Sequence, residues 1–432
     1  YTFKIWGQGI ACTYLGSGYG IFNYSTRWTN NSGDGRWSNP ANWSGEVPNA
    51  ASAVFFSCPG ASDAYLDINT TIGKLIIDPS YPATLHLGAK TLTLTAELTV
   101  PVASQLDAGT SLVIFGGSLW AGSTPPSVKV NAAAALYNLE VSANSNIAIN
   151  QHLNVIHNLT LTSVLSLNSD GAPSLLCTTG SIKVKGNLTN NDPDGWIAGG
   201  CNFWAYVSLV GSGDQTLSGT GKWANLDISK PSGNVLMATN IDFVSGATLA
   251  GFSPSVSMIN YPGRLRALGD ITFNCLARVD DVELLGNGNI TLYKNLNVND
   301  SLVLTSVNGM GNCGGGNINV KGHVINNDAN GWVAGGCGKW AAVSLVGSGD
   351  QTMDGTGLWG SIDISKPSGN VLMNSNINLV NNSVLTGTAS GKLLNNPGRL
   401  RPQSRIVFDY AGQVDDVELL NNCIMELYQH LN

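Results

Sequence analysis

Short runs of alternating apolar and polar residues recur along this chain, separated by turn residues. In the runs at 92–100 and 159–167, for example, leucine alternates with threonine. A period of two is typical of strands that bury one face, because successive side chains of a strand point to opposite sides. Ser, Asn, Pro and Gly between the runs favour turns. Since no window shows a sustained helical period, the sequence predicts an all-β fold.

A long internal repeat is the second feature of the sequence. The segment SLVGSGDQTLSGTGKWANLDISKPSGNVLM begins at Ser208 and returns with few changes at Ser344. The segment VDDVELL occurs at Val279 and again at Val414. Smaller units of three alternating runs lie inside the long repeat. This organisation favours a solenoid, in which each unit buries its apolar face against its neighbours.

Three alternating runs per unit fit the turns of a parallel β-helix better than the four-stranded blades of a propeller. We therefore predict an all-β, right-handed parallel β-helix, or solenoid, with an N-terminal cap segment. Tandem β-sandwich domains are the alternative, because the long repeat also has a plausible domain length. The expected divisions are an N-terminal cap or subunit-contact segment at 1–35, a first solenoid section at 36–176, large repeat 1 at 177–312, and large repeat 2 at 313–432, truncated at its C-terminal end.

Residues 36–56 have the sequence RWSNPANWSGEVPNAASAVFF, with two tryptophans followed by Val-Pro-Asn. This segment resembles the entry segment of autotransporter passengers and other secreted bacterial β-helix proteins. The GSGDQT stretches are similar to the repeats of large β-solenoid adhesins. The resemblance implies a β-helix fold and an extracellular or cell-surface location. It implies no chemistry, because the shared motifs are structural.

Composition narrows the function classes further. Only 11% of residues are charged, the formal net charge is -7, and no Lys/Arg cluster occurs. A nucleic-acid partner is therefore not expected, because such binders need a basic surface. No apolar run approaches the ~18 residues needed to span a membrane. Because the chain starts without Met and stops inside a repeat, we expect it to be processed or partial, with more repeats following.

The 8 cysteines, in a chain with so few charges, fit disulfides in an oxidising compartment. Two pairs of cysteines are separated by about one β-helix turn. Residues on neighbouring turns lie about 4.8 Å apart, which is within the reach of a disulfide. The predicted bonds are Cys177–Cys201, Cys313–Cys337 and Cys12–Cys58, which leaves Cys275 and Cys423 either free or paired with another subunit.

Two copies of an Asn/Asp-rich loop, NNDPDGW and NNDANGW, fall inside the predicted disulfide loops. Alternating Asn and Asp oxygens before a glycine are ligands of the kind that calcium takes. Neither copy has the later Glu of an EF-hand, and the alternative is an Asx-turn in which the side chains bind the local backbone. The candidate calcium ligands are Asn190, Asp192, Asp194, Asn326, Asp328 and Asn330; no other cofactor is expected.

Six tryptophans recur in register between the two copies of the long repeat. Exposed indoles would stack on sugar rings or dock a neighbouring subunit. Alternatively, each indole covers the end of a loop against the solenoid wall. The candidate ligand or subunit contacts are Trp196, Trp204, Trp223, Trp332, Trp340 and Trp359.

The best candidates for catalytic carboxylates are Asp280, Asp281 and Glu283, which follow Arg264 and Arg266. The same residue types return at Asp415, Asp416, Glu418, Arg399 and Arg401. Duplication at the same spacing is typical of a structural corner, such as an Arg–Asp pair at each turn. Because no GxSxG or HExxH motif occurs either, we assign no catalytic residue and do not expect an enzyme.

These features predict an extracellular structural or adhesive repeat protein that forms a rod or filament on or outside the cell. Its expected partners are other copies of itself, head-to-tail or lateral, and surface glycans, since repeated weak contacts give avidity without a catalytic group. The alternative is a carbohydrate-active β-helix: a polysaccharide lyase or hydrolase, a tailspike-like depolymerase, or a glycan-binding module.

Overall fold

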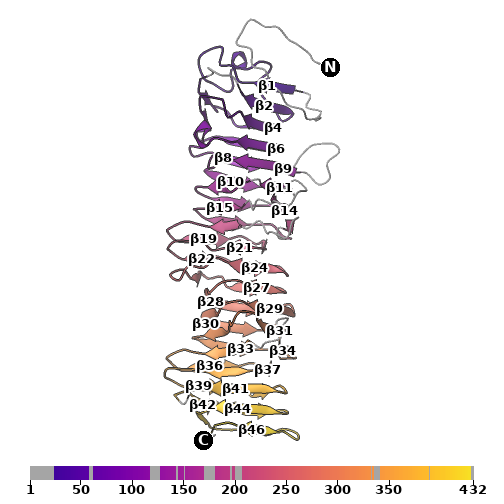
Figure 1. Ribbon diagram of the computed structural model, residues 1–432, viewed down its shortest axis with the longest axis vertical. Coiled ribbons are helices and arrows are strands. Elements are labelled where there is room, and N and C mark those ends of the chain that lie inside the picture. The colour runs from indigo at the N-terminus through magenta and orange to yellow at the C-terminus, as the bar shows by residue number, and fades with distance from the viewer. Residues whose placement is uncertain are drawn as a thin grey trace. The chain divides into compact units, whose positions relative to one another are not determined.

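In a computed structural model, parallel strands stack turn upon turn as a β-solenoid (Figure 1). The structure describes residues 24–57, 62–116, 127–142, 145–149, 151–169, 181–194, 197–199, 207–331, 333–334, 341–388 and 390–429. Within these ranges the only helical elements are the short 3-10 helices η1 (Pro40–Asn42) and η2 (Ala103–Gln105). No helix in this part of the chain is long and apolar enough to cross a membrane.

The chain divides into two compact units. Unit 1 consists of Tyr1–Asp192 with Trp196–Val207, and unit 2 consists of Pro193–Gly195 with Ser208–Asn432. The strands of unit 1 are β1 (Tyr24–Arg27), β2 (Ser52–Phe56), β3 (Ala64–Tyr65), β4 (Thr70–Ile77), β5 (Leu85–His86), β6 (Thr91–Val100), β7 (Leu106–Asp107), β8 (Leu112–Phe115), β9 (Ser127–Ala132), β10 (Asn138–Val141), β11 (Ser145–Ile149), β12 (Leu153–Val155), β13 (Leu159–Leu161), β14 (Val164–Ser169), β15 (Ile182–Val184), β16 (Leu188–Asn190) and β17 (Ile197–Gly199).

In unit 1, each turn places a strand against the equivalent strand of the turn before. One stack contains β8, β10, β13 and β16, and a second contains β9, β11, β14 and β17. A third face is formed by β3, β5 and β7 in the early turns and by β12 and β15 later. The long strand β4 pairs along both halves with β6, which in turn pairs with both β8 and β9, so β4 and β6 each contribute to two stacks.

The strands of unit 2 are β19 (Gln215–Ser218), β20 (Lys222–Trp223), β21 (Leu226–Asp227), β22 (Val235–Met237), β23 (Ile241–Phe243), β24 (Ala247–Ala250), β25 (Met258–Asn260), β26 (Leu265–Ala267), β27 (Ile271–Phe273), β28 (Ala277–Leu284), β29 (Gly288–Leu292), β30 (Leu296–Leu304), β31 (Val307–Asn312), β32 (Ile318–Val320), β33 (His323–Asn326), β34 (Val333–Ala334), β35 (Val343–Leu345), β36 (Gln351–Asp354), β37 (Leu358–Trp359), β38 (Ile362–Ile364), β39 (Val371–Met373), β40 (Ile377–Leu379), β41 (Ser383–Gly387), β42 (Lys392–Asn395), β43 (Leu400–Pro402), β44 (Ile406–Tyr410), β45 (Gln413–Val414) and β46 (Met425–Leu427). The short strand β18 (Val207–Leu209) contains residues of both units.

Three stacks also build unit 2. Stack A runs through β19, β22, β25, β28, β30, β32, β35, β38, β41, β44 and β46. Stack B runs through β20, β23, β26, β28, β30, β33, β36, β39, β42 and β45. Stack C contains β21, β24, β27, β29, β31 and β34, and later β37, β40 and β43. The strands β28 and β30 bend, so that their first halves lie in stack A and their second halves in stack B.

The inward positions of each stack form columns of aliphatic side chains. Val235, Met258, Val279 and Val298 occupy one such column of stack A, and all four are fully buried. Each buried side chain of this size stabilises the fold by about 1.5–3 kcal/mol relative to an exposed one. The alternating pattern of the sequence is therefore the pattern of inward and outward positions.

The predicted solenoid is confirmed, and the alternative of tandem β-sandwiches is wrong. The strand pairings among the described residues are parallel, whereas a sandwich of this kind is built from antiparallel sheets. An isolated antiparallel bridge joins Trp28 to Trp43 at the start of unit 1.

The two copies of the long repeat lie on different faces of unit 2. The strand β19 belongs to stack A, whereas β36, which carries the copied Gln-Thr sequence, belongs to stack B. In the same way β23 lies in stack B and its copy β40 in stack C. The long repeat is therefore not a whole number of turns, and each duplicated surface feature returns one face further round.

Candidate functional site

The Trp-rich entry segment forms a buried aromatic cluster. The ring of Trp43 packs edge-on against Trp37 at 4.7 Å and against Trp28 at 5.0 Å, and Phe56 lies beside all three. The Nε1–H of Trp43 donates to the carbonyl of Trp37 at 2.7 Å. Asn39 caps η1 between the two tryptophans by accepting the N–H of Ala41. These indoles close the core of the first turns and offer no surface to a ligand.

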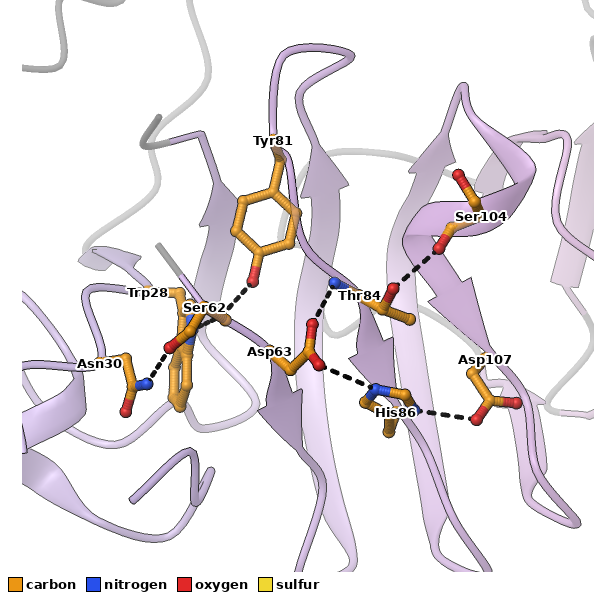
Figure 2. A network of polar contacts seen from close by, with 9 residues as sticks. All are labelled: Trp28, Asn30, Ser62, Asp63, Tyr81, Thr84, His86, Ser104 and Asp107. Carbon is orange, nitrogen blue, oxygen red and sulfur yellow. Dashed lines mark hydrogen bonds and ion pairs between the residues drawn. The ribbon is translucent and has the colours of Figure 1, made fainter. Parts of the chain in front are cut away.

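A second polar cluster lies on the outer side of β3, β5 and β7 (Figure 2). Tyr65, His86 and Asp107 occupy one register on these three strands. The Nδ1 atom of His86 lies 2.9 Å from Oδ2 of Asp107, and its Nε2 atom lies 3.6 Å from Oδ2 of Asp63. The imidazole is thus held between two carboxylates that come from the turn before and the turn after. The sequence gives no sign of this cluster, because its members are far apart in the chain and carry no motif.

Backbone contacts fix the carboxylates and the chain around them. The second oxygen of Asp63 accepts the N–H of Thr84 at 2.9 Å, and the Thr84 hydroxyl donates to the carbonyl of Ser104 at 3.0 Å. As Figure 2 shows, Tyr81 and Trp28 both donate to the carbonyl of Ser62, at 2.9 and 3.1 Å. The polar cluster therefore sits on a rigid base that is continuous with the aromatic cluster.

The charges of this cluster limit its chemistry. The hydrogen bond from His86, together with the N–H of Gly109, lowers the pKa of Asp107 below its usual value of 3.8. Asp107 is therefore a carboxylate near neutral pH and cannot serve as a carboxylic acid there. Asp63, His86 and Asp107 remain partly open to solvent, with 45%, 28% and 57% of their side chains exposed. Among the described residues, no group of three or more His, Cys, Asp or Glu side chains is placed to hold a metal ion.

The candidate catalytic carboxylates pair with arginines on neighbouring turns. Asp242, Arg266 and Glu283 occupy one outward register of stack B. The Nε atom of Arg266 lies 3.4 Å from Asp242 and 3.7 Å from Glu283, and Arg264 lies 3.9 Å from Glu283. Opposite charges on adjacent rungs attract, and their alternation favours one register between turns. This arrangement fits the structural interpretation of these residues.

The duplicated set makes the same kind of contact. Arg401 reaches Glu418 at 2.8 Å, and Arg399 lies 3.4 Å from Asp416 and 3.5 Å from Glu418. Asp415 is contacted by the side chain of Gln413 at 3.4 Å. The expected Arg–Asp pair is thus present in this copy, with Arg–Glu pairs beside it.

The remaining candidates, Asp280 and Asp281, lie at the bend of β28. Asp281 is buried and accepts hydrogen bonds from the N–H and hydroxyl of Ser301 and from the Asn260 amide. The register of β28 against β30 shifts at this point. Asp280 accepts from Asn299 at 3.1 Å. Both carboxylates therefore join neighbouring turns where the strand changes face.

The Asn/Asp loops proposed for calcium make Asx-turn contacts. In the second copy, Oδ1 of Asn326 accepts the N–H of Asp328 at 3.0 Å, and Oδ1 of Asp328 accepts the N–H of Asn330 at 3.2 Å. Both Asn326 and Asp328 are fully buried. Gly357 packs directly on this turn, since a Cβ there would lie 2.6 Å from the Asp328 nitrogen. The GTG motif therefore provides the close approach that the loop requires.

The first copy repeats the contact between the Asn and the Asp, and its Asp also binds a neighbouring turn. Oδ1 of Asn190 accepts the N–H of Asp192 at 3.0 Å, and Oδ2 of Asp192 accepts the N–H of Val164 at 3.2 Å. Asp194 is exposed. Calcium remains a prediction at both loops, and the described contacts favour the Asx-turn.

Replacing Asp328 by Asn separates the two interpretations. Burial raises the pKa of the Asp328 carboxyl above 3.8, and the backbone N–H groups of Asn330 and Val307 offset only part of this effect. A raised pKa in the folded state means that stability falls as pH rises from 3.8 through the folded value. In the absence of calcium at pH 7, Asp328→Asn should therefore leave the free energy of unfolding unchanged or raise it by up to about 1 kcal/mol, measured by urea denaturation. Calcium that raised the Tm of the wild type but not of this variant would contradict the Asx-turn account.

The structure corrects the proposed role of two tryptophans. Trp223 and Trp359, on the equivalent strands β20 and β37, are fully buried, so neither ring can meet a ligand or a second subunit. Each lies in register with a buried residue of the next turn, Trp223 with Phe243 and Trp359 with Leu379, so both occupy inward positions. The other candidates, Trp196, Trp204, Trp332 and Trp340, lie outside the described residues.

None of the three predicted disulfide pairings can be compared with the structure. Cys12, Cys58, Cys177, Cys201 and Cys337 lie outside the described residues, so all three bonds, including Cys313–Cys337, remain predictions. Cys275 and Cys423 are free thiols. Burial raises the pKa of Cys275 to about 11, and its thiol donates to the carbonyl of Leu249 at 3.4 Å. Cys423 is only partly buried.

Alkylation should distinguish the two free thiols. At pH 8, iodoacetamide should modify Cys423 in the native protein at least about ten times faster than Cys275, because the thiolate is the reactive form and access is needed. After denaturation in urea the two rates should converge. Peptide mapping by mass spectrometry measures both, and equal native rates would contradict the burial of Cys275.

A buried lysine, not predicted from the sequence, lies at a corner of each long repeat. The Nζ atom of Lys230 donates to the carbonyls of Gly211 and Gly213 at 3.0 and 2.7 Å, and to Oε1 of Gln215 at 2.8 Å. Only 1% of Lys230 is exposed, and burial lowers its pKa to about 8. Three acceptors match the three N–H groups of the ammonium ion. We refer to this arrangement as the lysine cage.

The second copy of the lysine cage has the same geometry. Lys366 donates to Gly347, Gly349 and Gln351 at 2.9, 2.8 and 2.6 Å. The turns beside it also match: the N–H groups of Asn234 and Asn370 each bind the Asp that precedes the cage glutamine, at 2.7 Å. The motif GSGDQT followed by SKPSGN is the sequence signal of the cage. This motif is visible in the sequence as a repeat, but nothing in the motif indicates that its lysine is buried.

Taken together, the fold and these contacts define the chain as a parallel β-solenoid whose polar residues mainly join successive turns. Comparison with family models, with curated proteins and with solved structures found no match. The fold is compatible with the resemblance to solenoid surface proteins, and no family is assigned.

Proposed function

We propose that this chain is an extracellular structural or adhesive repeat protein. The observation that carries the proposal is the use of its polar residues: lysine cages and charge ladders are duplicated and join one turn to the next, and Asx-turns hold the loop backbone in both copies. A catalytic centre needs a set of groups that converge on a substrate, and duplication of the whole set is not expected of one. The low charge of the chain also supports a scaffold.

Surface location can be tested on intact cells that produce the protein. An antiserum raised against unit 2 should label these cells, and external protease should remove the label while a cytosolic marker stays intact. The proposal predicts loss of at least about nine-tenths of the signal. Protection of the protein in intact cells, with release only on lysis, would overturn it.

Adhesion supplies the second test. Repeated features of unit 2 face successive sides, so we propose that other copies of the protein or surface glycans are contacted from more than one direction. A chain that contains both long repeats should then bind a glycan array more tightly than a chain that contains one, because linked weak sites give avidity. Equal binding by the two chains would contradict a multivalent role.

A carbohydrate-active enzyme is the second candidate, and one observation favours it. Among the described residues the Asp63–His86–Asp107 cluster occurs once; it is partly exposed and combines a base with carboxylates. Incubation with a panel of polysaccharides tests this candidate through new reducing ends or unsaturated sugars. Products that disappear in His86→Gln would establish it, and the absence of products would leave the scaffold proposal.

A further inference from the structure

In the part of unit 1 that the structure describes, two stacked Tyr–His pairs differ in their charged neighbours. The rings of Tyr65 and His86 are 4.8 Å apart at 7°, and those of Tyr137 and His157 are 4.8 Å apart at 12°. His86 faces two carboxylates, whereas Nδ1 of His157 lies 2.9 Å from the amide oxygen of Asn138. The chain thus provides its own control for the effect of charge on a stacked histidine.

The number of protons on His86 decides which contacts it can make. A neutral imidazole has one N–H, and the 2.9 Å contact with Asp107 places this proton on Nδ1. Nε2 then turns a lone pair toward the Asp63 carboxylate, and two electron-rich atoms face each other at 3.6 Å. A second proton converts Nε2 into a donor, so that both carboxylates are bound at once.

The groups around the ring support this arrangement. Among the described residues, Tyr65 and Asp63 face His86 from the turn before, and Asp107 faces it from the turn after. Arg36 forms a backbone bridge to Tyr65 one turn further away from His86. Since the pKa of Asp107 is lowered, this carboxylate keeps its charge in mildly acidic solution. The negative charge nearest the ring therefore outweighs the positive charge.

We propose that protonation of His86 closes a clasp across the three successive turns that carry β3, β5 and β7. The clasp joins the Asp63 side of β3 to β5 and keeps the existing contact between β5 and β7. The backbone bonds beneath it run from Leu66 to the carbonyl of His86, and from Leu87 to the carbonyl of Asp107, both at 2.9 Å. Acid therefore strengthens the first turns of unit 1, while neutral or alkaline solution loosens them.

Hydrogen exchange on the full chain tests the clasp. After correction for intrinsic exchange, the Leu66 amide should be about three-fold better protected at pH 5 than at pH 8, the size expected of a partly exposed ion pair. His86→Gln should abolish this difference. Asp63→Asn should also abolish it for Leu66, while its side-chain oxygen can still accept the Thr84 N–H.

The matched control is His157→Gln, which removes the other stacked histidine. It should leave the pH dependence at Leu66 unchanged. Equal protection of Leu66 at pH 5 and pH 8 in the wild type would overturn the proposal, as would loss of the effect in His157→Gln. If His86→Gln unfolds, the Asp63→Asn variant alone still decides between these outcomes.

Discussion

Replacing Lys366 by Met should lower the free energy of unfolding by about 3 kcal/mol. Met has a similar length and fills most of the same space, but it donates no hydrogen bond. The carbonyl of the buried Gly347 would then lose its donor, and Oε1 of Gln351 would keep only the N–H of Gly347. The carbonyl of Gly349, an exposed residue, would lose the lysine as well. Buried acceptors left unsatisfied cost about 1–3 kcal/mol each, and partial relaxation reduces the sum. Urea denaturation followed by circular dichroism measures the change.

Two further variants make this prediction specific. Lys230→Met removes the other lysine cage and should cost a similar amount. Lys392→Met, at an exposed position of β42, should change stability by less than about 0.5 kcal/mol. A loss in Lys366→Met no larger than that of Lys392→Met would show that the cage does not hold the corner.

Replacing Trp43 by Ala should cost about 3–5 kcal/mol, and the loss should stay in the first turns. The indole is 4% exposed, packs on Trp28, Trp37 and Phe56, and holds the Trp37 carbonyl. Because the stability of a solenoid is close to a sum over neighbouring turns, damage at one end need not spread. Hydrogen exchange should show faster exchange in β1, β2 and β4.

The more conservative variant Trp43→Phe is the control for this experiment. It keeps an aromatic ring and should recover about half of the lost protection. Strands β38, β41 and β44 of unit 2 should exchange at wild-type rates in both variants. Uniform loss of protection in unit 2 would contradict a local cap.

Several parts of the fold were predictable from the sequence because they depend on local patterns. Alternation of Leu and Thr in 92–100 fixes which side chains point inward, and the burial of Leu92, Leu94, Leu98 and Val100 follows it. The Asx-turn at Asn326 was open as an alternative because Asn and Asp bind the backbone two residues on. A parallel stack then followed from the repeat of such units.

The faces of the long repeat could not be predicted, because they depend on how many strands complete a turn. Equivalent strands such as β19 and β36 have the same sequence pattern but lie in different stacks. If each repeat had one strand more or one strand fewer, the second copy would lie on another face. The alternation shows whether each side chain points inward or outward. It does not show how many strands make up a turn, so it cannot assign a residue to one of the three stacks.

The polar clusters were hidden for a related reason. Lys230 and Lys366 are buried although lysine is usually exposed, and only the nearby carbonyls explain their position. His86 meets Asp63 and Asp107 through register between turns, at sequence distances where no motif operates. Conversely, the recurrence of Trp223 and Trp359 suggested contacts with a ligand or a second subunit. Recurring residues are required by a buried core as much as by a surface, and both rings are buried.

In-register stacking of parallel strands is the central claim, and distances between spin labels test it most directly. Asn297, Asn319, Ser344, Asp363, Thr386 and Asp409 occupy one outward column of stack A. With labels on unnatural amino acids, which leave the cysteines intact, the backbone separation should be about 19 Å for the pair 319 and 409, and about 24 Å for the pair 297 and 409. Pulsed electron paramagnetic resonance should therefore give a longer distance for the pair 297 and 409 than for the pair 319 and 409, by one strand spacing. Distances that do not grow with the number of turns, or that exceed about 35 Å, would contradict the solenoid.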